Sequence, residues 1–222
     1  MRICCETIRR SVSVCIDDGV VRDLRQGGEA ERDAAAMLAD LVRKHGRPAA
    51  FAMAVGPGSF TGLRVGLVAV RTLAWLHDVP VAPVDSLTAI ACAAGPGLWL
   101  PLLPLKRDTT FAALIRVHPD GRPEVLAPTT ALADAGPCLS APADAVVTGP
   151  AVEEKPDLVT RWAPGAVVRS GVVDATGVAL AARWVDPVPW AQALPAYHLE
   201  PGPVLQRRLR EQVASDHGSG PR

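Results

Sequence analysis

The chain has 222 residues, 49% of them hydrophobic, so it can form one large domain or two small domains with a substantial core. Its 23 basic and 23 acidic side chains cancel, which argues against the broad basic surface typical of nucleic-acid-binding domains. Five cysteines without a C-x-x-C pair argue against a disulfide framework or a cysteine zinc site, and no apolar run has signal-peptide or membrane-span length, so we expect a cytoplasmic protein without a membrane span.

Three β-prone runs open the chain, at residues 2–5, 11–16 and 20–24. Asp17-Asp18-Gly19 separates the second run from the third and is typical of a hairpin turn. Gly27-Gly28 then interrupts the pattern. The first section of the chain is therefore predicted to form three strands.

Residues 29–45 give the clearest helix pattern. Acidic residues begin the segment, basic residues end it, and Gly46 and Pro48 follow as stop signals. One face carries an apolar stripe at helical spacing, made of Ala34, Met37, Leu38, Leu41 and Val42. A fourth strand is predicted at residues 50–55.

Residues 56–66 read Gly-Pro-Gly-Ser-Phe-Thr-Gly-Leu-Arg-Val-Gly and lead into a second helix, predicted to end at Leu76. Glycines at a strand–helix junction permit unusual backbone angles and close approach, and the helix N-terminus could hold an anion. The alternative is a packing turn in which Ser59 or Thr61 caps the helix. The turn is not a P-loop, because Leu63 replaces the lysine, and it lacks the third glycine of the dinucleotide fingerprint.

The second helix is apolar on almost every side, which predicts that it is buried on more than one side. One side covers the sheet. The other is covered either by a partner helix, to which Gly62 and Gly66 would allow close approach, or by the second half of the chain. Its least apolar stripe is predicted to face away from the sheet and consists of Arg64, Val68, Arg71 and Trp75.

The second half of the chain is harder to interpret. Strands are predicted at residues 100–105, 110–117 and 145–147, a short helix at 129–135 and a final helix at 178–184. Prolines between residues 187 and 203 disfavour regular structure there, and the chain after Arg210 is expected to be disordered.

Residues that would carry catalysis or metal binding are missing from the sequence. None of the five histidines lies within a helical turn of another, and no G-x-S-x-G nucleophile motif occurs. The sequence therefore predicts no catalytic residue, no metal and no cofactor.

The motif at residues 56–66, continuing through the helix to Val79-Pro80-Val81 and Asp85-Ser86-Leu87, resembles the TsaB (YeaZ) family. This family is the dimerisation subunit of the bacterial tRNA threonylcarbamoyladenosine machinery. The resemblance covers residues 51–91, and residues 195–199 resemble the closing segment of the family. It implies an α/β, actin-like (ribonuclease-H-like) fold with two lobes, the second reduced: residues 1–98, residues 99–210 and a tail at 211–222.

The resemblance also implies a role without catalysis. The chain would bind and organise the TsaD subunit, which transfers a threonylcarbamoyl group to N6 of the adenosine following the anticodon. The TsaE ATPase and tRNA would be reached through the complex, and a second copy of the chain would replace TsaD when TsaD is absent. The predicted partner interface consists of Met37, Leu41, Arg64, Val68, Arg71 and Trp75.

The chain departs from the family where an actin-like protein would hold a nucleotide. The family has Asp-Thr-Ser after the first strand, whereas this chain has Glu6-Thr7-Ile8. A histidine near the start of the first helix is also replaced. The alternative function is an actin-like ATPase or phosphotransferase, and its vestigial or active nucleotide site would consist of Glu6, Thr7, Gly56, Gly58 and Ser59.

Overall fold

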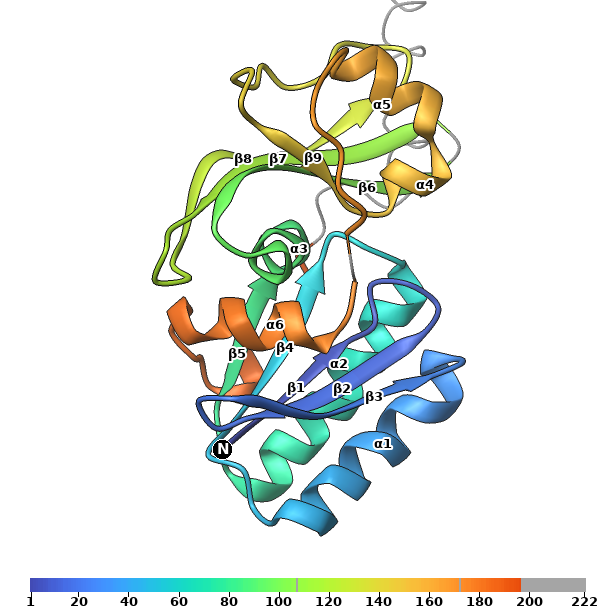
Figure 1. Ribbon diagram of the computed structural model, residues 1–222. Coiled ribbons are helices and arrows are strands. Elements are labelled where there is room, and N and C mark those ends of the chain that lie inside the picture. The colour runs from blue at the N-terminus through green and yellow to red at the C-terminus, as the bar shows by residue number, and fades with distance from the viewer. Residues whose placement is uncertain (107, 172, 197–222) are drawn as a thin grey trace, which may run out of the picture.

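The structure is a computed structural model, and it describes residues 1–106, 108–171 and 173–196. The described chain forms two lobes, each built on its own sheet, and helix α3 (Ser86–Ala94) lies between them (Figure 1). Residues 197–199 of the motif that resembles the closing segment of the family, and the predicted tail at 211–222, lie outside the described residues.

The first sheet has five strands in the order β3-β2-β1-β4-β5. Strand β2 runs antiparallel to both neighbours, whereas β1, β4 and β5 are parallel to one another. Their bounds are β1 Arg2–Glu6, β2 Val12–Asp17, β3 Val21–Gly27, β4 Ala50–Gly56 and β5 Val81–Asp85. This arrangement confirms the predicted strands and the ribonuclease-H-like plan of the first lobe.

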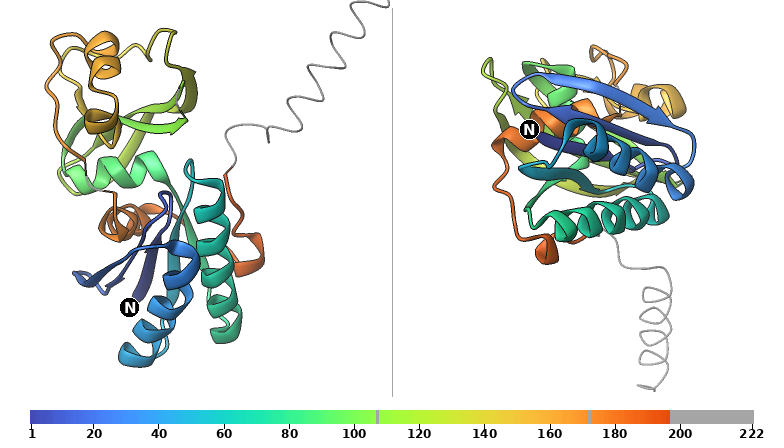
Figure 2. Two further views of the ribbon diagram at one scale, coloured as in Figure 1. Left: turned by 90° about the vertical axis from the view of Figure 1, so that its right-hand side faces the viewer. Right: turned by 90° about the horizontal axis from the view of Figure 1, so that it is seen from below.

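Helices cover both faces of the first sheet (Figure 2). Helices α1 (Ala30–His45) and α2 (Phe60–His77) lie side by side on one face, and α6 (Ala175–Ala181) lies on the other. Because strand side chains alternate, Ile3 and Cys5 join the core under α1 and α2, whereas Cys4 joins the core under α6. The sheet is therefore the middle layer of an α/β/α lobe.

The second sheet has four strands in the order β8-β7-β6-β9. Two short helices, α4 (Ala151–Glu154) and α5 (Pro156–Trp162), belong to the same lobe. The strands are β6 Gly97–Lys106, β7 Thr109–Val117, β8 Pro123–Ala133 and β9 Val146–Thr148. The short helix predicted at residues 129–135 is wrong, because this segment lies in the extended edge strand β8 and its following turn. β-branched Thr129 and Thr130 favour a strand there, and pairing with β7 fixes it.

Among the described residues, the α-helices α3, α4 and α5 were not predicted. The reason is clearest for α3. Seven of its nine residues are buried, so it lacks the polar face that gives a helix its sequence periodicity. Its burial comes from both lobes, since it contacts β4 and β5 of the first sheet and β6, β7 and β8 of the second.

After the second sheet the chain returns to the first lobe. Helix α6 contacts β1, β2 and β4, and it continues into a 3₁₀ turn at Ala182–Trp184, so a helix is confirmed in the predicted range 178–184. Val188 pairs with Val81 at the edge of the first sheet. We therefore propose that the first lobe includes residues 173–196 as well as the predicted 1–98. None of the helices in the described ranges has the length and hydropathy that a membrane span requires.

Candidate functional site

The glycine turn between β4 and α2 is packed against the loop that joins β1 to β2. The Ser59 hydroxyl accepts a hydrogen bond from the Gly62 N–H at 3.3 Å, so Ser59 caps α2. The Ser59 N–H donates to the Ile8 carbonyl at 2.6 Å, and a Cβ added to Gly58 would lie 2.6 Å from the Ile8 Cβ. These contacts support the packing interpretation of the turn.

Gly62 and Gly66 face the same loop. A Cβ on Gly62 would lie 2.2 Å from the Thr7 carbonyl oxygen, and one on Gly66 would lie 2.3 Å from Thr7 Oγ1. The prediction that these glycines admit a partner helix is therefore wrong, because the β1–β2 loop already occupies that side of α2. Over the other side of the turn, Ala196 donates to the Val55 carbonyl at 2.8 Å.

The predicted nucleotide-site residues come together around this turn. The Glu6 carboxylate is 2% exposed and accepts a hydrogen bond from the Ile8 N–H. Burial raises the pKa of Glu6 to about 8, although the hydrogen bonds from the backbone of the loop act to lower it. The Asp174 carboxylate adds to the rise. At Gly56, Gly58 and Ser59, therefore, the chain itself packs against the glycine turn, and a buried carboxyl group lies beside them. Within the described ranges, no three His, Cys, Asp or Glu side chains are placed to hold a metal ion.

A groove of about 720 Å³ runs between α1 and α2 on the outer surface of the first lobe. Glu31, Ala35 and Ala39 form its α1 wall, and the α2 wall contains Phe60, Thr61, Arg64, Val65, Val68, Ala69, Thr72 and Leu73. The two alanines lie four residues apart, so they share one side of α1 and leave room between the helices. Most of the lining side chains are apolar.

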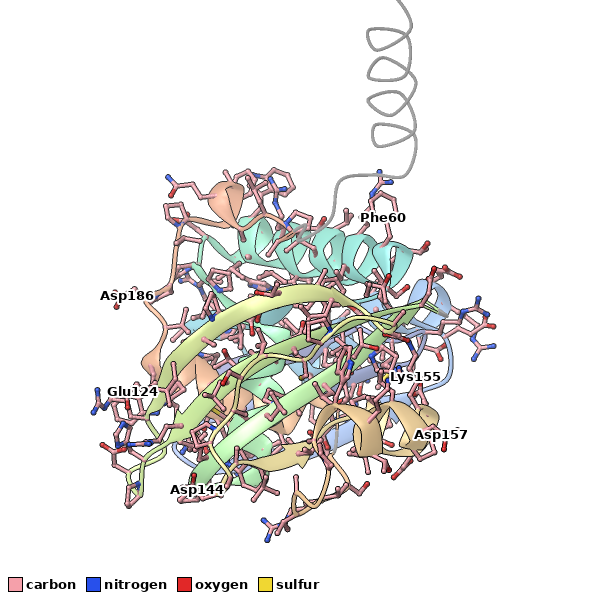
Figure 3. All side chains as sticks on the ribbon, turned by 90° about the horizontal axis from the view of Figure 1, so that it is seen from above. Phe60, Glu124, Asp144, Lys155, Asp157 and Asp186 are labelled. Atoms are coloured by element: carbon pink, nitrogen blue, oxygen red, sulfur yellow. The ribbon has the colours of Figure 1, made fainter. Side chains whose placement is uncertain are left out.

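Helix α2 exposes large hydrophobic side chains along its whole length. Val68 and Trp75 are 66% and 61% exposed, which confirms that they face away from the sheet. Phe60 and Leu76, at the two ends of the helix, are 51% and 65% exposed. Figure 3 shows Phe60 on the outer side of α2. A row of such residues on one helix is typical of a protein-interaction surface.

Two arginines lie in this row with different surroundings. The guanidinium of Arg64 lies 5.0 Å from the centre of the Phe60 ring, so a positive charge and an aromatic ring lie next to each other on the outer side of α2. Arg71 lies 6.0 Å from the ring of Trp190 and donates to the Ala191 carbonyl at 3.4 Å. Arg71 therefore also helps to hold the C-terminal part of the described chain against α2.

The two predicted interface residues on α1 are less accessible. Leu41 is fully buried in the core under α1 and α2, so we leave it out of the candidate interface. Met37 is half-buried, and its sulfur packs close to Gly27 at the end of β3. Glu31, Ala35 and Ala39, which line the groove instead, were not predicted from the sequence. Their spacing of four residues was the available signal, but alanines carry little hydropathy contrast.

Comparison with known proteins places the chain in a family. Residues 35–159, more than half of the chain, match the family model "TsaD: tRNA N6-adenosine threonylcarbamoyltransferase". A TsaB protein from Bacillus subtilis, described as a tRNA threonylcarbamoyladenosine biosynthesis protein, is 38% identical over 64 residues, 28% of each chain. A TsaB protein from Haemophilus influenzae is 53% identical over 45 residues, 20% of this chain and 19% of that protein. The aligned segments thus span less than a third of these curated relatives.

Solved structures confirm the fold over nearly the whole chain. YeaZ from Pseudomonas aeruginosa superimposes with a TM-score of 0.74 at 20% identity, covering 88% of this chain and 98% of that one. A second Pseudomonas aeruginosa structure, described as similar to peptidase YeaZ, gives a TM-score of 0.74 at 21% identity, with 89% and 99% covered. At these identities the likeness concerns the fold alone. From the family match, the curated relatives and the shared fold together, the chain belongs to the family that the TsaD model describes and, among its members, to the TsaB (YeaZ) proteins.

Proposed function

We propose that the chain is a non-catalytic subunit that binds and organises TsaD for threonylcarbamoyl transfer to N6 of the adenosine following the anticodon in tRNA. The observation that carries the proposal is the apolar groove between α1 and α2 together with the exposed row on α2. The names of the curated relatives, both tRNA threonylcarbamoyladenosine biosynthesis proteins, supply the pathway.

The groove suits a helical partner. Two parallel-lying helices with an apolar channel between them can accept the matching helices of another actin-like lobe, as an amphipathic helix fills a hydrophobic groove. Val68 and Trp75 would become buried at the centre of such a contact, and Arg64 beside an aromatic ring suits an interface hot spot. TsaD is the proposed occupant, with a second copy of the chain when TsaD is absent. TsaE and tRNA would join through the complex.

The state of the glycine turn supports a role without catalysis. Backbone from Ile8 lies against Gly58, and the Ala196 carbonyl lies over Gly56, so the chain itself fills the space beside the α2 N-terminus where a phosphate would approach. The alternative function, an actin-like ATPase or phosphotransferase, draws its support from the buried Glu6 carboxylate beside the same turn. We favour the subunit role because it also accounts for the exposed α2 row.

Co-purification with TsaD from the same organism tests the proposal. Tagged wild-type chain should retain TsaD, and Val68→Glu should lose it, because the new carboxylate would have to be desolvated at the centre of an apolar contact. Val167→Glu is the matched control, since Val167 is 67% exposed and lies far from the groove, in the second lobe. Retention of TsaD by a folded Val68→Glu chain at wild-type affinity would contradict this interface.

A further inference from the structure

We propose that a cavity at one end of the inner strands of the first sheet, between Arg2 and Arg183, binds a small oxyanion. The cavity has a volume of about 400 Å³. It lies at the end of the sheet where β1 and β4 begin and β2 ends, beside the N-terminus marked in Figure 1. It is lined by Met1, Arg2, Asp17, Gly19, Ala49, Ala50 and Arg183. This site is separate from the α1–α2 groove and does not depend on the proposed function.

Four separate parts of the chain build the cavity. Arg2 at the start of β1 pairs in register with Asp17 at the end of β2, so the two side chains leave the sheet on the same face. Arg183 reaches that face from the turn that follows α6. It also donates to the Gly19 carbonyl at 3.1 Å, which ties the β2–β3 turn to the cavity wall.

Asp17 is already satisfied by Arg183. The Arg183 Nη2 and Nε atoms donate to the two carboxylate oxygens of Asp17 at 2.8 and 3.2 Å, and the Gly19 N–H donates at 3.1 Å. Although burial opposes ionisation, these hydrogen bonds hold the pKa of Asp17 below its usual value. Asp17 is therefore ionised at neutral pH, and it neutralises one of the two guanidinium groups.

Arg2 supplies a second positive charge, and it shares the single Asp17 carboxylate with Arg183. Its guanidinium lies 3.9 Å from the nearest Asp17 oxygen, beyond hydrogen-bond distance, and its side chain is only 23% exposed. Among the described residues no acceptor is in hydrogen-bond contact with the guanidinium. Its Nε atom is buried, so the donors that an anion in the cavity could reach are those of the two Nη atoms. The two Nη atoms carry four of the five N–H donors of a guanidinium, and these can donate to the oxygens of an anion.

The side chains of Arg2, Arg183 and Asp17 together give the cavity wall one net positive charge, and the Nη donors of Arg2 lie on a planar, forked group. This is the chemistry that recognises phosphate or carboxylate oxygens. A cavity of this size admits a small anion rather than a polymer. Inorganic phosphate and acetate are small anions that carry these two kinds of oxygen.

The test is calorimetric titration of the full chain with inorganic phosphate and, separately, with acetate, at low salt and neutral pH. At least one anion should bind with a Kd of about 1 mM or tighter. Arg2→Met should weaken that binding about tenfold or more, the loss typical of a charged hydrogen bond. Arg22→Met is the control, because Arg22 is an exposed arginine in the neighbouring hairpin, paired with Asp18 outside the cavity.

Two results would overturn the inference. If neither anion binds the wild-type chain, water satisfies Arg2 and no anion site exists. If an anion binds but Arg2→Met binds it equally well, the binding site lies elsewhere. Should Arg2→Met fail to fold, Arg2→Lys replaces it, since lysine keeps the charge but loses the forked donors and should still weaken binding.

Discussion

The Thr7 carbonyl oxygen lies where a side chain on Gly62 would begin, only 2.2 Å from a Cβ built on that glycine. The Arg9 carbonyl oxygen is the next nearest atom, at 2.7 Å. Both are backbone atoms of the β1–β2 loop, so neither can move away by a side-chain rotation. This contact holds the first turn of α2 against the β1–β2 loop.

Gly62→Ala should therefore destabilise the protein, although alanine is the better helix former by about 1 kcal/mol. The added methyl must push the β1–β2 loop away from α2, and such overpacking typically lowers the free energy of unfolding by about 1–3 kcal/mol. Chemical denaturation measures the change. Gly28→Ala is the control, because the nearest atom to its Cβ would be a flexible arginine nitrogen at 3.3 Å. Equal stability of the two variants would show that the loop yields easily.

The buried Glu6 carboxyl group should make stability depend on pH. Its pKa of about 8 in the folded protein exceeds the value of 4.5 for an unperturbed group, so the folded state binds the proton more tightly than the unfolded chain. The stabilisation of the folded state that comes from this tighter proton binding is fully present below pH 4.5 and is lost as the pH rises towards 8.

The matched variant is Glu6→Gln, which keeps an acceptor for the Ile8 N–H but does not ionise. The stability of Glu6→Gln relative to wild type should increase between pH 5 and 8, by about 5 kcal/mol at most. Urea denaturation of both proteins across that range measures the difference. A difference that stays constant with pH would mean that Glu6 titrates normally in the folded protein.

The isolated chain should bind ATP–Mg weakly or not at all. Backbone of the chain packs against Gly56 and Gly58, and the sequence has no P-loop lysine to reach a phosphate. Isothermal titration measures the affinity. Submillimolar binding that disappears in Glu6→Ala would favour the ATPase or phosphotransferase alternative over the subunit role.

Trp75→Glu should abolish self-association of the chain in the absence of TsaD. The side chain is 61% exposed in the isolated chain, and truncating or charging a central aromatic residue typically costs 2 kcal/mol or more of association free energy. Analytical ultracentrifugation over a concentration series gives the dimer fraction, with Val167→Glu as the control. The melting temperature of the monomer should stay nearly unchanged. If the wild-type chain is itself monomeric at all concentrations, this face does not support a homodimer.

The isolated chain should show no measurable affinity for tRNA at physiological salt. Its formal net charge is zero, and neutralisation of phosphates dominates binding that does not depend on sequence. A gel shift of unmodified tRNA with increasing protein, repeated at low and high salt, tests this. A micromolar shift with a steep salt dependence would reveal a basic surface that the overall charge conceals.

The elements of the first lobe were predictable because their signals are local. Helix α1 carries charges that match its dipole and an apolar stripe, and β4 is a continuous apolar run that ends at a glycine turn. The exposure of Val68 and Trp75 also followed from helical spacing, since their stripe is the least apolar on α2. Strand β8 and helix α3 were missed because pairing with β7 decides the first and burial between two lobes decides the second.

The sequence by itself determined the order of the five strands of the first sheet and of helices α1 and α2, the glycine turn before α2 and the exposed row on α2, because periodicity and glycine positions act over a few residues. Only the tertiary structure decided what each surface meets. It placed Thr7 rather than a partner against Gly62, buried Leu41, and brought Arg183 to Asp17 from 166 positions away. The physical reason is that such contacts depend on how layers pack and where the chain returns, which no local pattern of residues encodes.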